Sequence, residues 1–422
     1  MKKRIALLGA GTVGSGVCKL IAENGAMMAR NTGVEIEIAA ILVRDVKKPR
    51  PGVPQELLTN DFARILEDDS ICLCAEAMGG TDPALSYALA ALKAGKSYVT
   101  ANKELVSKHF EELEQAAAHS GAGLYFEPSV AGAVPVIKAL SDSLSANRIH
   151  GVMGIINGTT NYIMSKMSQE GLGYSEALKQ AQELGYAEPD PTNDVEGYDA
   201  RFKLAILASL AFDARVRVED IYCEGITQIT AEDVQIAHDL GFGIKLLAIG
   251  KMVDGKVQVR VHPTMLPLSH PLCAVSGPFN AVYVDASAAG ELMFYGRGAG
   301  DMPTASAMVG DVLHALTQEK QRRYPFALPG GCQAQIADDW QCAFFIHTLA
   351  KDEPSVLGRV ASILGAHGVS SEAVMQKGKE NNGAVPVVFI THETSEKACM
   401  AAIAEIKQLD IIEVQNIIRV EQ

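Results

Sequence analysis

The sequence predicts an α/β protein: a Rossmann-type doubly wound parallel sheet, then an α+β substrate and dimerisation domain, then a ferredoxin-like βαββαβ unit. Three observations carry this prediction. A glycine-rich turn joins a β-like run to a helical run near the start of the chain, strands and helices then alternate up to residue 127, and a second alternation with the order βαββαβ follows residue 341. The chain has 422 residues, enough for two or three domains.

The composition excludes several classes of protein. Charged residues make up 21%, hydrophobic residues 48%, and the formal net charge is −13, so a soluble globular protein without nucleic-acid or membrane partners is expected. The eight cysteines form no C-x-x-C pair, and no histidine cluster has metal-ligand spacing. The apolar run Ile5 to Ala10 is too short for a signal peptide, and no segment approaches the roughly 18 apolar residues of a membrane helix. These features indicate a cytoplasmic protein with free thiols.

Residues 4–16 read RIALLGAGTVGSG, a β-like run that enters a G-x-G-x-x-G turn, after which a helical pattern continues to about Ala29. Glycines in such a turn permit a tight bend and a close approach of the backbone to a pyrophosphate, which the helix N–H groups then face. We therefore expect a dinucleotide cofactor at this turn, against Gly9, Gly11, Thr12, Val13 and Gly14.

The rhythm of a parallel sheet continues with strands expected at 35–44, 71–78, 97–101 and 124–127, and helices expected at 83–94 and 103–119. Ligands in such sheets bind at the carboxyl ends of the strands. The loops 78–81 and 100–103 leave those ends, which directs Gly80 and Lys103 toward the cofactor crevice. A lysine at a helix start is unfavourably placed relative to the helix dipole, and an anionic or carbonyl-bearing ligand would explain it.

The end of the second strand addresses the choice of cofactor. Arg44 is suited to a 2′-phosphate, which favours NADP(H). Asp45 follows it directly, and an acid at this place is typical of sites that bind a bare ribose hydroxyl. NAD(H) therefore stays an alternative.

The stretch 188–203 reads EPDPTNDVEGYDARFK and precedes the apolar run LAILASLAF. Two prolines prevent helix in its first part, and a helical pattern begins at Glu196. Asp199 and Lys203 then share one helix face one turn apart. An exposed ion pair would be the ordinary interpretation, but the apolar continuation predicts burial, which would lower the pKa of Lys203 toward the range useful for proton transfer.

In the same stretch Glu188 and Asp190 are held by the prolines, and they are candidates to bind the ammonium group of an amino-acid substrate. A polar run at 155–162 either lines a substrate pocket or caps the next helix. A second glycine-rich turn, which contains Gly300, precedes a helix expected at 304–318. That helix is expected to return to the first domain and cover the cofactor.

These patterns divide the chain into a cofactor domain at 1–134 completed by the returning helix, a substrate domain at 135–317, a linker at 318–341 and a C-terminal unit at 342–422. In the C-terminal unit, strands are expected at 342–349, 369–376, 384–391 and 411–419, and helices at 355–367 and 395–408. The unit lacks a candidate catalytic group, which indicates a binding or regulatory role.

Together these motifs resemble the longer bacterial homoserine dehydrogenases over essentially the whole chain. The matching segments are GAGTVG at 9–14, NK at 102–103, NGTTN at 157–161 and GYAEPDP at 185–191, followed by Asp194, Gly197, Asp199 and Lys203. The C-terminal unit, with DEPSVL at 352–357, resembles an ACT domain.

The resemblance implies an NAD(P)H-dependent reduction of L-aspartate 4-semialdehyde to L-homoserine, on the route to threonine, methionine and isoleucine. It also implies that Glu188 and Asp199 hold the substrate while Lys103 and Lys203 flank the reacting carbonyl. From the residue chemistry we expect Lys203, set by Asp199, to be the general acid and base and Lys103 to polarise the oxygen, although these roles can be exchanged.

Three further expectations come from the same resemblance. A sodium ion would bind backbone carbonyls, which fall on Glu127, Val130, Gly132 and Val134 in this chain. The protein would form a homodimer or homotetramer. The ACT domain would bind an amino-acid effector such as L-threonine, but Ser355 stands where such domains usually carry glycine, and its side chain would crowd the effector.

Other functions stay open at this point. A different ACT-containing dehydrogenase, acting on a 2-hydroxy acid, would need a paired histidine and acid, and no such pair stands out in the sequence. A phosphorylating semialdehyde dehydrogenase would need an activated cysteine, whereas Cys72 and Cys74 lie in an expected buried strand. A non-catalytic sensor of amino acids and nucleotides would bind NADPH without turnover.

Overall fold

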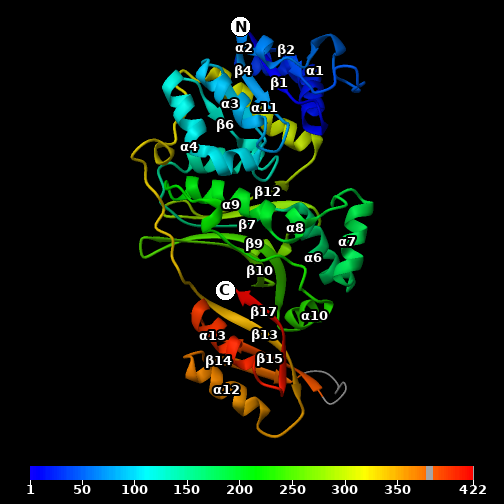
Figure 1. Cartoon of the computed structure of the whole chain (residues 1–422), viewed down its shortest axis with the longest axis vertical. Helices are drawn as coiled ribbons and strands as arrows, with labels where there is room; N and C mark the ends of the chain where they lie inside the picture. Colours follow the sequence, from blue (N-terminus) through cyan, green and yellow to red (C-terminus); the bar gives the residue numbers. More distant parts are fainter. Residues whose placement is uncertain (377–383, 422) are drawn as a thin grey trace.

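The computed structural model describes residues 1–376 and 384–421. The molecule is elongated, with the N-terminal unit at one end, a large sheet with its helices in the middle and the C-terminal unit at the other end (Figure 1). None of the helices in the described part of the chain is both long and apolar enough to cross a membrane.

The N-terminal unit is a six-stranded parallel sheet with the order β3-β2-β1-β4-β5-β6. This order is doubly wound, as the sequence predicts, and the winding reverses between β1 and β4. Its strands are β1 Lys2–Leu8, β2 Glu35–Leu42, β3 Leu58–Thr59, β4 Ile71–Glu76, β5 Ser97–Thr100 and β6 Leu124–Tyr125. Its helices are α1 Thr12–Thr32, α2 Phe62–Glu67, α3 Ala84–Lys93 and α4 Lys103–Ser120.

Close contacts explain the glycines of the first turn. Gly9 has a φ of 101°, and a Cβ there would lie 2.8 Å from the carbonyl oxygen of Ala77. A Cβ at Gly14 would lie 2.2 Å from the carbonyl oxygen of Gly9, so α1 can begin at this distance from β1 only with glycine. The turn therefore stays bare and close to the sheet.

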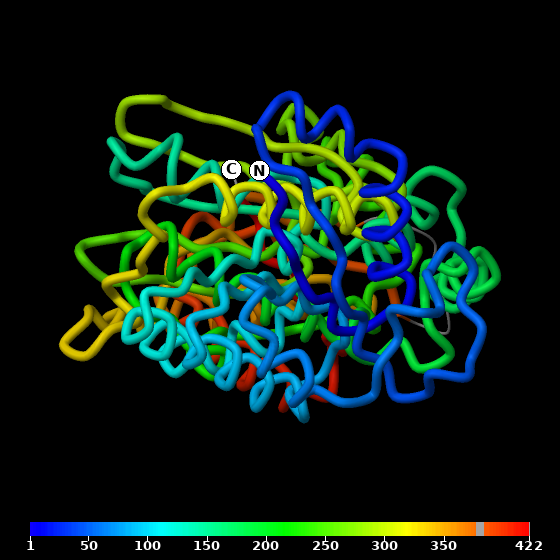
Figure 2. The backbone as a smooth tube through the Cα atoms, turned by 90° about the horizontal axis from the view of Figure 1, so that it is seen from above, coloured from blue at the N-terminus to red at the C-terminus, as the bar shows by residue number. Residues whose placement is uncertain are grey.

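The returning helix is α11 Asp301–Thr317. It runs beside α1 in both Figures 1 and 2, and its apolar side chains join those of β1 and α1 in one buried cluster. Gly16 allows this close packing, because a Cβ there would lie 3.1 Å from the Cβ of Ala305. The helix thus completes the N-terminal unit from a distant part of the chain.

The middle of the molecule is built on a long hairpin that the sequence patterns do not predict: β9 and β10 pair over their full lengths of 12 residues each. The strands of this part are β7 Ile149–Ile155, β8 Tyr222–Cys223, β9 Phe242–Val253, β10 Lys256–Pro267, β11 Phe279–Ala286 and β12 Gly290–Arg297. Its helices are α5 Val136–Lys138, α6 Gly158–Glu170, α7 Tyr174–Glu183, α8 Thr192–Val195, α9 Tyr198–Ala211 and α10 Ala231–Asp239.

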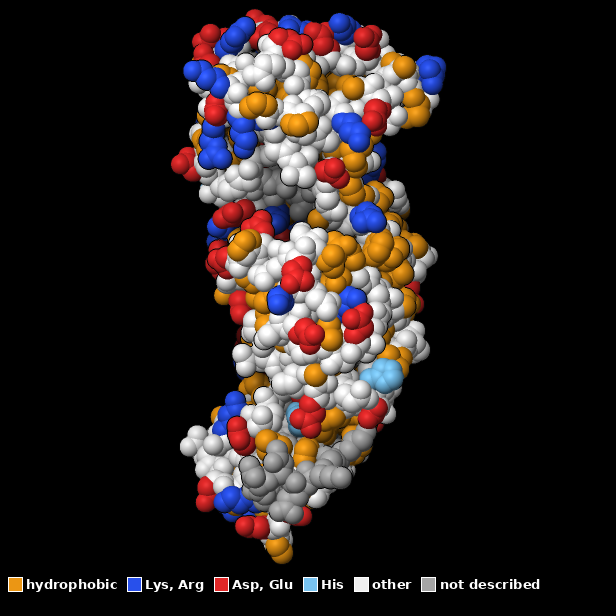
Figure 3. Space-filling view, turned by 90° about the vertical axis from the view of Figure 1, so that its right-hand side faces the viewer, with side chains coloured by type: hydrophobic (Ala, Val, Ile, Leu, Met, Phe, Trp, Pro, Cys, Tyr) orange, Lys and Arg blue, Asp and Glu red, His pale blue; other side chains and the backbone are white. Residues whose placement is uncertain are grey.

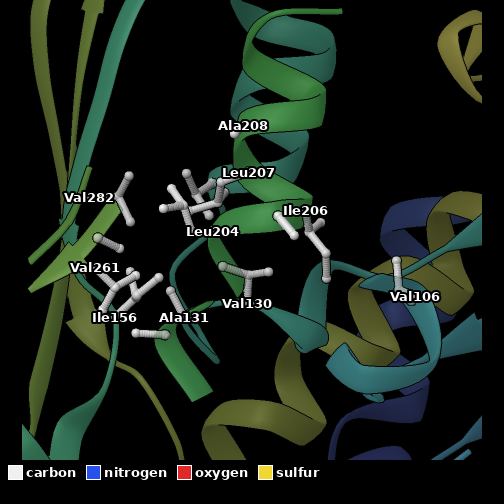
Figure 4. Close-up of a cluster of buried hydrophobic side chains, with 14 of the residues drawn as sticks. Val106, Val130, Ala131, Ile156, Leu204, Ile206, Leu207, Ala208, Val261 and Val282 are labelled. Atoms are coloured by element: carbon white, nitrogen blue, oxygen red, sulfur yellow. The ribbon is translucent and has the colours of Figure 1, made fainter. Parts of the chain in front are cut away.

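Helix α9 is buried between the middle sheet and the N-terminal unit. Leu204 and Leu207 point toward Val261 and Val282 of the sheet, while Ile206 points toward Val106 on the opposite side (Figure 4). Apolar side chains therefore surround α9 on both sides, which explains the continuous apolar run and places the first turn of the helix at the boundary between the two units.

The C-terminal unit has the predicted order βαββαβ, interrupted only by a two-residue strand. Its elements are β13 Gln341–Lys351, α12 Val356–Ala366, β14 Ser371–Gln376, β15 Ala384–Thr391, β16 Thr394–Ser395, α13 Glu396–Ile406 and β17 Ile412–Val420. The four longer strands follow the ferredoxin-like order β17-β13-β15-β14.

This unit does not stand apart from the middle sheet. Strand β17 pairs in parallel with β10 at Thr264 and Met265, which joins the two parts in one 11-stranded sheet. The predicted linker is also anchored, because the backbone of Gln333 and Ile336 forms bridges with Arg215 and Val257 of the middle part.

Candidate active site

Asp199 and Lys203 form the buried centre of the site. Both lie on α9, with relative exposures of 4% and 9%, and the Lys203 Nζ lies 2.7 Å from the Asp199 Oδ2. The same ammonium donates a second hydrogen bond, of 2.8 Å, to the carbonyl oxygen of Ile156. The pair is therefore a buried ion pair with a fixed direction, not an exposed one.

Burial and charge act in opposite directions on this pair. Loss of water around the ammonium lowers the pKa of Lys203, and the nearby Asp199 carboxylate only partly offsets this effect. Burial by itself would favour the neutral acid at Asp199, but the ammonium groups of Lys203 and Lys103 outweigh it and hold the pKa of Asp199 well below its usual range. A lysine that releases its proton more readily than usual thus lies beside a permanently ionised carboxylate.

Lys103 reaches the same carboxylate from the N-terminal unit. It is the first residue of α4, and its Nζ lies 2.5 Å from the Asp199 Oδ1. Burial lowers the pKa of Lys103, but the charge of Asp199 and its hydrogen bond raise it more, so the net shift is upward. Its side chain is 41% exposed, unlike that of Lys203. The ion pair explains why a cation occupies a helix start.

Asn157 is a member of the site whose role the sequence leaves undecided. Its Nδ2 donates to the Asp199 Oδ2 at 2.9 Å and to the Asp194 Oδ1 at 2.7 Å. Its Oδ1 accepts from the backbone N–H of Thr160, so it also caps α6. The capping interpretation of the polar run is therefore confirmed, and the same residue also binds the carboxylate of the buried ion pair. The available signal is the polar run directly after a strand, but its partners lie too far along the chain to be identified from the pattern.

The acidic loop contributes less to this cluster than its composition indicates. Glu188 is exposed, and among the described residues its carboxylate forms no ion pair with either lysine. The Asp190 Oδ1 accepts hydrogen bonds from the backbone N–H and the hydroxyl of Thr192, so it stabilises the turn before α8. The Glu188 carboxylate thus forms no ion pair with the lysines of the site, whereas the Asp190 carboxylate binds Thr192 in its own turn.

Asp199 joins a lysine of the N-terminal unit to a lysine of the middle part, and the side chain of Lys103 is 41% exposed. Figure 3 shows a hollow between the N-terminal unit and the middle part, with acidic and basic side chains along its border. A small substrate that enters from this side would meet charged groups before it meets the apolar interior.

The glycine-rich loops fit a dinucleotide. Gly11 precedes α1 without a side-chain cap, and a Cβ there would meet no atom within 4 Å. Within the described residues, the backbone N–H groups of Thr12 and Val13 have no backbone acceptor, as anion binding at a helix start requires. Gly80, with a φ of 70°, and Gly300, with a φ of 126° directly before α11, form two further bare turns.

Arg44 and Asp45 lie just beyond β2, both exposed. The Asp45 Oδ1 accepts the backbone N–H of Lys47 at 2.8 Å, and the Asp45 carbonyl accepts from the Arg50 guanidinium. Within the described residues Arg44 forms no ion pair. Asp45 thus has a local structural role, while Arg44 stays free to bind a ligand.

The residues assigned to sodium lie in a buried turn between β6 and α5. The Glu127 carboxylate accepts backbone N–H groups of Ile137 and Lys138, so its charge is used to cap α5. Within the described residues, the carbonyls of Val130 and Gly132 accept no backbone hydrogen bond, whereas those of Glu127 and Val134 accept the N–H groups of Val130 and Val136. No cluster of His, Cys, Asp and Glu side chains suited to a metal ion occurs in the described part of the chain.

The cysteines of β4 are unsuited to covalent catalysis. Burial raises the pKa of Cys72, and it raises the pKa of Cys74 to about 12. Both thiols are therefore neutral near pH 7, whereas a nucleophilic cysteine needs the thiolate.

Comparison with known proteins agrees with this geometry. Residues 9–127 match the family model "Homoserine dehydrogenase, NAD binding domain", and residues 135–313 match the model "Homoserine dehydrogenase". The homoserine dehydrogenase of Corynebacterium glutamicum is 43% identical over 429 residues, which cover 99% of this chain and 95% of the relative.

Solved structures agree as well. The crystal structure of a homoserine dehydrogenase from Thiobacillus denitrificans is 38% identical, with a TM-score of 0.94, and covers 100% of this chain and 99% of its own. A hyperthermophilic archaeal homoserine dehydrogenase in complex with NADPH is 27% identical, with a TM-score of 0.65, over 76% of this chain and 100% of its own. The chain therefore belongs to the homoserine dehydrogenase family of NAD(P)-dependent oxidoreductases.

Proposed function

We propose that the protein reduces L-aspartate 4-semialdehyde to L-homoserine with a nicotinamide cofactor. The observation that carries this proposal is the cluster of Lys103, Asp199 and Lys203 at the boundary between the N-terminal unit and the middle part. Reduction of an aldehyde needs positive charge and one proton at the carbonyl oxygen, and two ammonium groups beside a single carboxylate supply both.

When bound at the glycine-rich turn, a nicotinamide cofactor would supply a hydride for the aldehyde carbon. Lys203 transfers a proton from Nζ to the carbonyl oxygen as the electron pair of the C=O bond moves onto that oxygen, and the neutral amine then regains a proton from water. Lys103 polarises the same oxygen. Asp199 holds both amines, while Ile156 and Asn157 fix the direction of the pair.

The substrate's own ammonium group needs a separate carboxylate. Asp199 already accepts from Lys103, Lys203 and Asn157. We assign Glu188 to the substrate ammonium, because its carboxylate is exposed and forms no ion pair in the described structure, and we assign Asp199 to the substrate through the two lysines that it holds. A Glu188→Gln variant should raise KM for the semialdehyde more than it lowers kcat.

For the cofactor we propose a preference for NADP(H). Arg44 is unpaired among the described residues, and the Asp45 carboxylate is occupied by its own turn. The archaeal relative bound to NADPH supports the same choice. Initial rates with NADPH and NADH test it, and Arg44→Ala should reduce the ratio of the two.

We also propose a structural sodium ion held by the carbonyls of Glu127, Val130, Gly132 and Val134. The turn is buried and holds two successive residues with positive φ, Ala131 at 54° and Gly132 at 55°. Thermal unfolding in sodium chloride and in tetramethylammonium chloride of equal ionic strength should differ if the ion stabilises the fold.

We propose that the protein forms a homodimer through one face of the middle sheet. Met293 and Tyr295 on β12 are 43% and 54% exposed, and Tyr295 stacks on Phe279 of β11. An apolar patch of this kind on a sheet surface is typical of a protein interface. Light scattering should give twice the chain mass, and Tyr295→Arg should reduce it.

For the C-terminal unit we propose weak binding of L-threonine. The ferredoxin-like topology supports the assignment to ACT domains, and Ser355 limits the affinity because its side chain stands at the turn before α12. Calorimetry with L-threonine tests the proposal, and an absence of binding heat contradicts it.

The decisive experiment is the consumption of NADPH with L-aspartate 4-semialdehyde, followed at the absorbance of the reduced cofactor. A dehydrogenase turns over, whereas a sensor binds NADPH without turnover. Lys203→Met should remove most of the rate in the first case and should change nothing in the second.

A further inference from the structure

Glu76 is the last residue of β4, at the point where the winding of the N-terminal sheet reverses. It lies opposite Leu8 of β1 on one side and Thr100 of β5 on the other. The crevice that receives a dinucleotide in such sheets lies outside the carboxyl ends of these strands. Glu76 is therefore the acidic residue directly beneath the crevice.

The side chain of Glu76 is 0% exposed and is held by neutral donors alone. Its Oε1 accepts the backbone N–H groups of Met78 and Gly79, at 2.5 Å and 3.3 Å, and its Oε2 accepts the hydroxyl of Thr100 at 2.6 Å. In the described part of the chain no lysine, arginine or histidine forms an ion pair with it. Asp199 and Glu421 lie against cations, whereas Glu127 is held by backbone N–H groups as Glu76 is.

Burial raises the pKa of Glu76, and the hydrogen bonds from Thr100, Met78, Gly79 and Asn102 oppose that shift by favouring the ionised form. An ionised carboxylate without a cation costs several kcal/mol in a protein interior. A purely structural role does not need this charge, since a glutamine could accept the same backbone N–H groups.

The loop above Glu76 leads toward open space. A Cβ at Gly79 or at Gly80 would meet no atom within 4 Å. The neighbouring strand end leads through Asn102, whose Nδ2 donates to the Gly80 carbonyl at 2.5 Å, to Lys103 of the active site. The loop 78–81 is thus bound to the Glu76 carboxylate directly. The loop 100–103 is bound to it through Thr100.

We propose that the Glu76 carboxylate supplies the negative charge that favours the oxidised, cationic nicotinamide ring over the neutral reduced ring. The inference rests on the proposed function, which places the ring in this crevice. Positive charge develops on the ring as the hydride leaves for the aldehyde carbon. A fixed negative charge under the loop stabilises that change, and it acts through a medium of lower dielectric constant than water.

Glu76→Gln tests the inference, because it keeps the shape and the backbone acceptor but removes the charge. Dissociation constants for NADP⁺ and NADPH are measured by calorimetry on the full-length protein. We expect the variant to bind NADP⁺ about tenfold more weakly while its affinity for NADPH changes less than about twofold. Thr100→Ser keeps the hydroxyl, its two hydrogen bonds and the charge of Glu76, so it should leave the ratio of the two constants unchanged.

A second pair of variants covers the case in which Glu76→Gln does not fold. Met78 is half-buried, its backbone N–H donates to Glu76, and its side chain lies against Gly9 of the glycine-rich turn, so Met78→Lys places a cation at the cofactor turn on the residue that binds the carboxylate. It should shift the ratio in the same direction as Glu76→Gln, and Met78→Gln should not shift it.

An unchanged ratio in both charge variants, or an equal weakening of both cofactor forms, overturns the inference and leaves the proposed function standing. A wild-type protein that binds neither form overturns the placement of the cofactor, and this inference with it.

Discussion

The Nζ of Lys103 lies 2.5 Å from the Oδ1 of Asp199, so a lysine of the cofactor unit and a carboxylate of the middle part meet in one ion pair. The other oxygen of the same carboxylate holds Lys203 at 2.7 Å. Asp199 therefore positions both amines, and the site is complete only when the two parts of the molecule lie together.

Lys203→Met should lower kcat at least about 100-fold, because the proposed proton donor is lost while the apolar stem of the side chain is kept. The KM for NADPH should stay within about threefold, since the glycine-rich turn is untouched. Initial rates with the semialdehyde check this. Lys166→Met is the matched control, because Lys166 pairs with Glu170 on the surface of α6. A Lys203 variant with more than about a tenth of the wild-type kcat would contradict the assignment.

The rate of reduction should fall on the alkaline side at a pH below 10.5, the ordinary pKa of lysine, because burial lowers the pKa of Lys203 and the donor must carry its proton. The reverse oxidation needs the neutral amine, so its rate should rise with pH through the same pKa. Asp199→Asn removes the negative charge that stabilises the ammonium form of Lys203. The fall of the reduction rate and the rise of the oxidation rate should therefore both occur at lower pH. Asp338→Asn, at a surface pair with Lys397, should change the pH dependence of neither rate.

Glu114→Gln should stabilise the protein in mildly alkaline solution. Glu114 is fully buried on α4, where it accepts the backbone N–H of Tyr324, and burial raises its pKa from 4.5 to about 7. Between these two values the folded state binds more protons than the unfolded state, so stability falls as the pH rises from about 4.5 to about 7. The variant lacks this loss, and its advantage should be about 1 to 3 kcal/mol near pH 8.

Urea unfolding near pH 4 and near pH 8 measures the effect of Glu114→Gln. At the lower pH the two proteins should be close in stability, because wild-type Glu114 is then protonated in both states. An advantage of equal size at both pH values would show that the carboxyl group does not titrate as proposed.

Ser355→Gly should stabilise the C-terminal unit by up to about 1 kcal/mol. Ser355 has a φ of 76° at the start of α12, and its hydroxyl makes no capping hydrogen bond. Glycine adopts this left-handed conformation without the Cβ clash, although it also has more freedom in the unfolded chain. Thermal unfolding compares the variant with Ser355→Ala, which keeps the Cβ and should bring no gain. A less stable glycine variant would contradict the argument.

Arg419→Met should weaken both stability and catalysis. Arg419 lies on β17 with 3% exposure and donates to Glu396 of the C-terminal unit, to Glu224 and to the hydroxyl of Tyr222. Its loss leaves two acids without their cation, which typically costs about 3 to 5 kcal/mol.

The expected effect of Arg419 on catalysis depends on the segment 222–224, which Arg419 binds and which in turn contacts the residues before α9. The thiol of Cys223 donates to the Glu196 carbonyl at 3.3 Å, directly before α9 and therefore close to Asp199. We expect kcat to fall with little change in the KM for NADPH. Lys397→Met breaks an exposed pair in the same unit and should change stability by less than about 1 kcal/mol. Equal effects of the two substitutions would rule out a coupling of this kind.

Local chemistry in the sequence determined much of the fold and part of the site. The first glycine-rich turn marks α1, and every predicted strand and helix of the N-terminal and C-terminal units occurs in the structure within a few residues of its expected bounds. The spacing of Asp199 and Lys203 places them on one helix face, and the apolar run after them predicts the burial that the structure has. Turn geometry and periodicity depend on near neighbours in the chain, so they can be read locally.

Only the tertiary structure decided which distant residues meet. Lys103 reaches Asp199, Asn157 joins Asp194 to Asp199, and β17 extends the sheet of β10. Each of these contacts depends on how separate elements pack. An apolar pattern in the sequence predicts that a surface is buried, but it does not predict which polar group will lie next to it. The site therefore forms only where the N-terminal unit contacts the middle part. The local sequence around each side chain shows that it is charged but not which residue it binds.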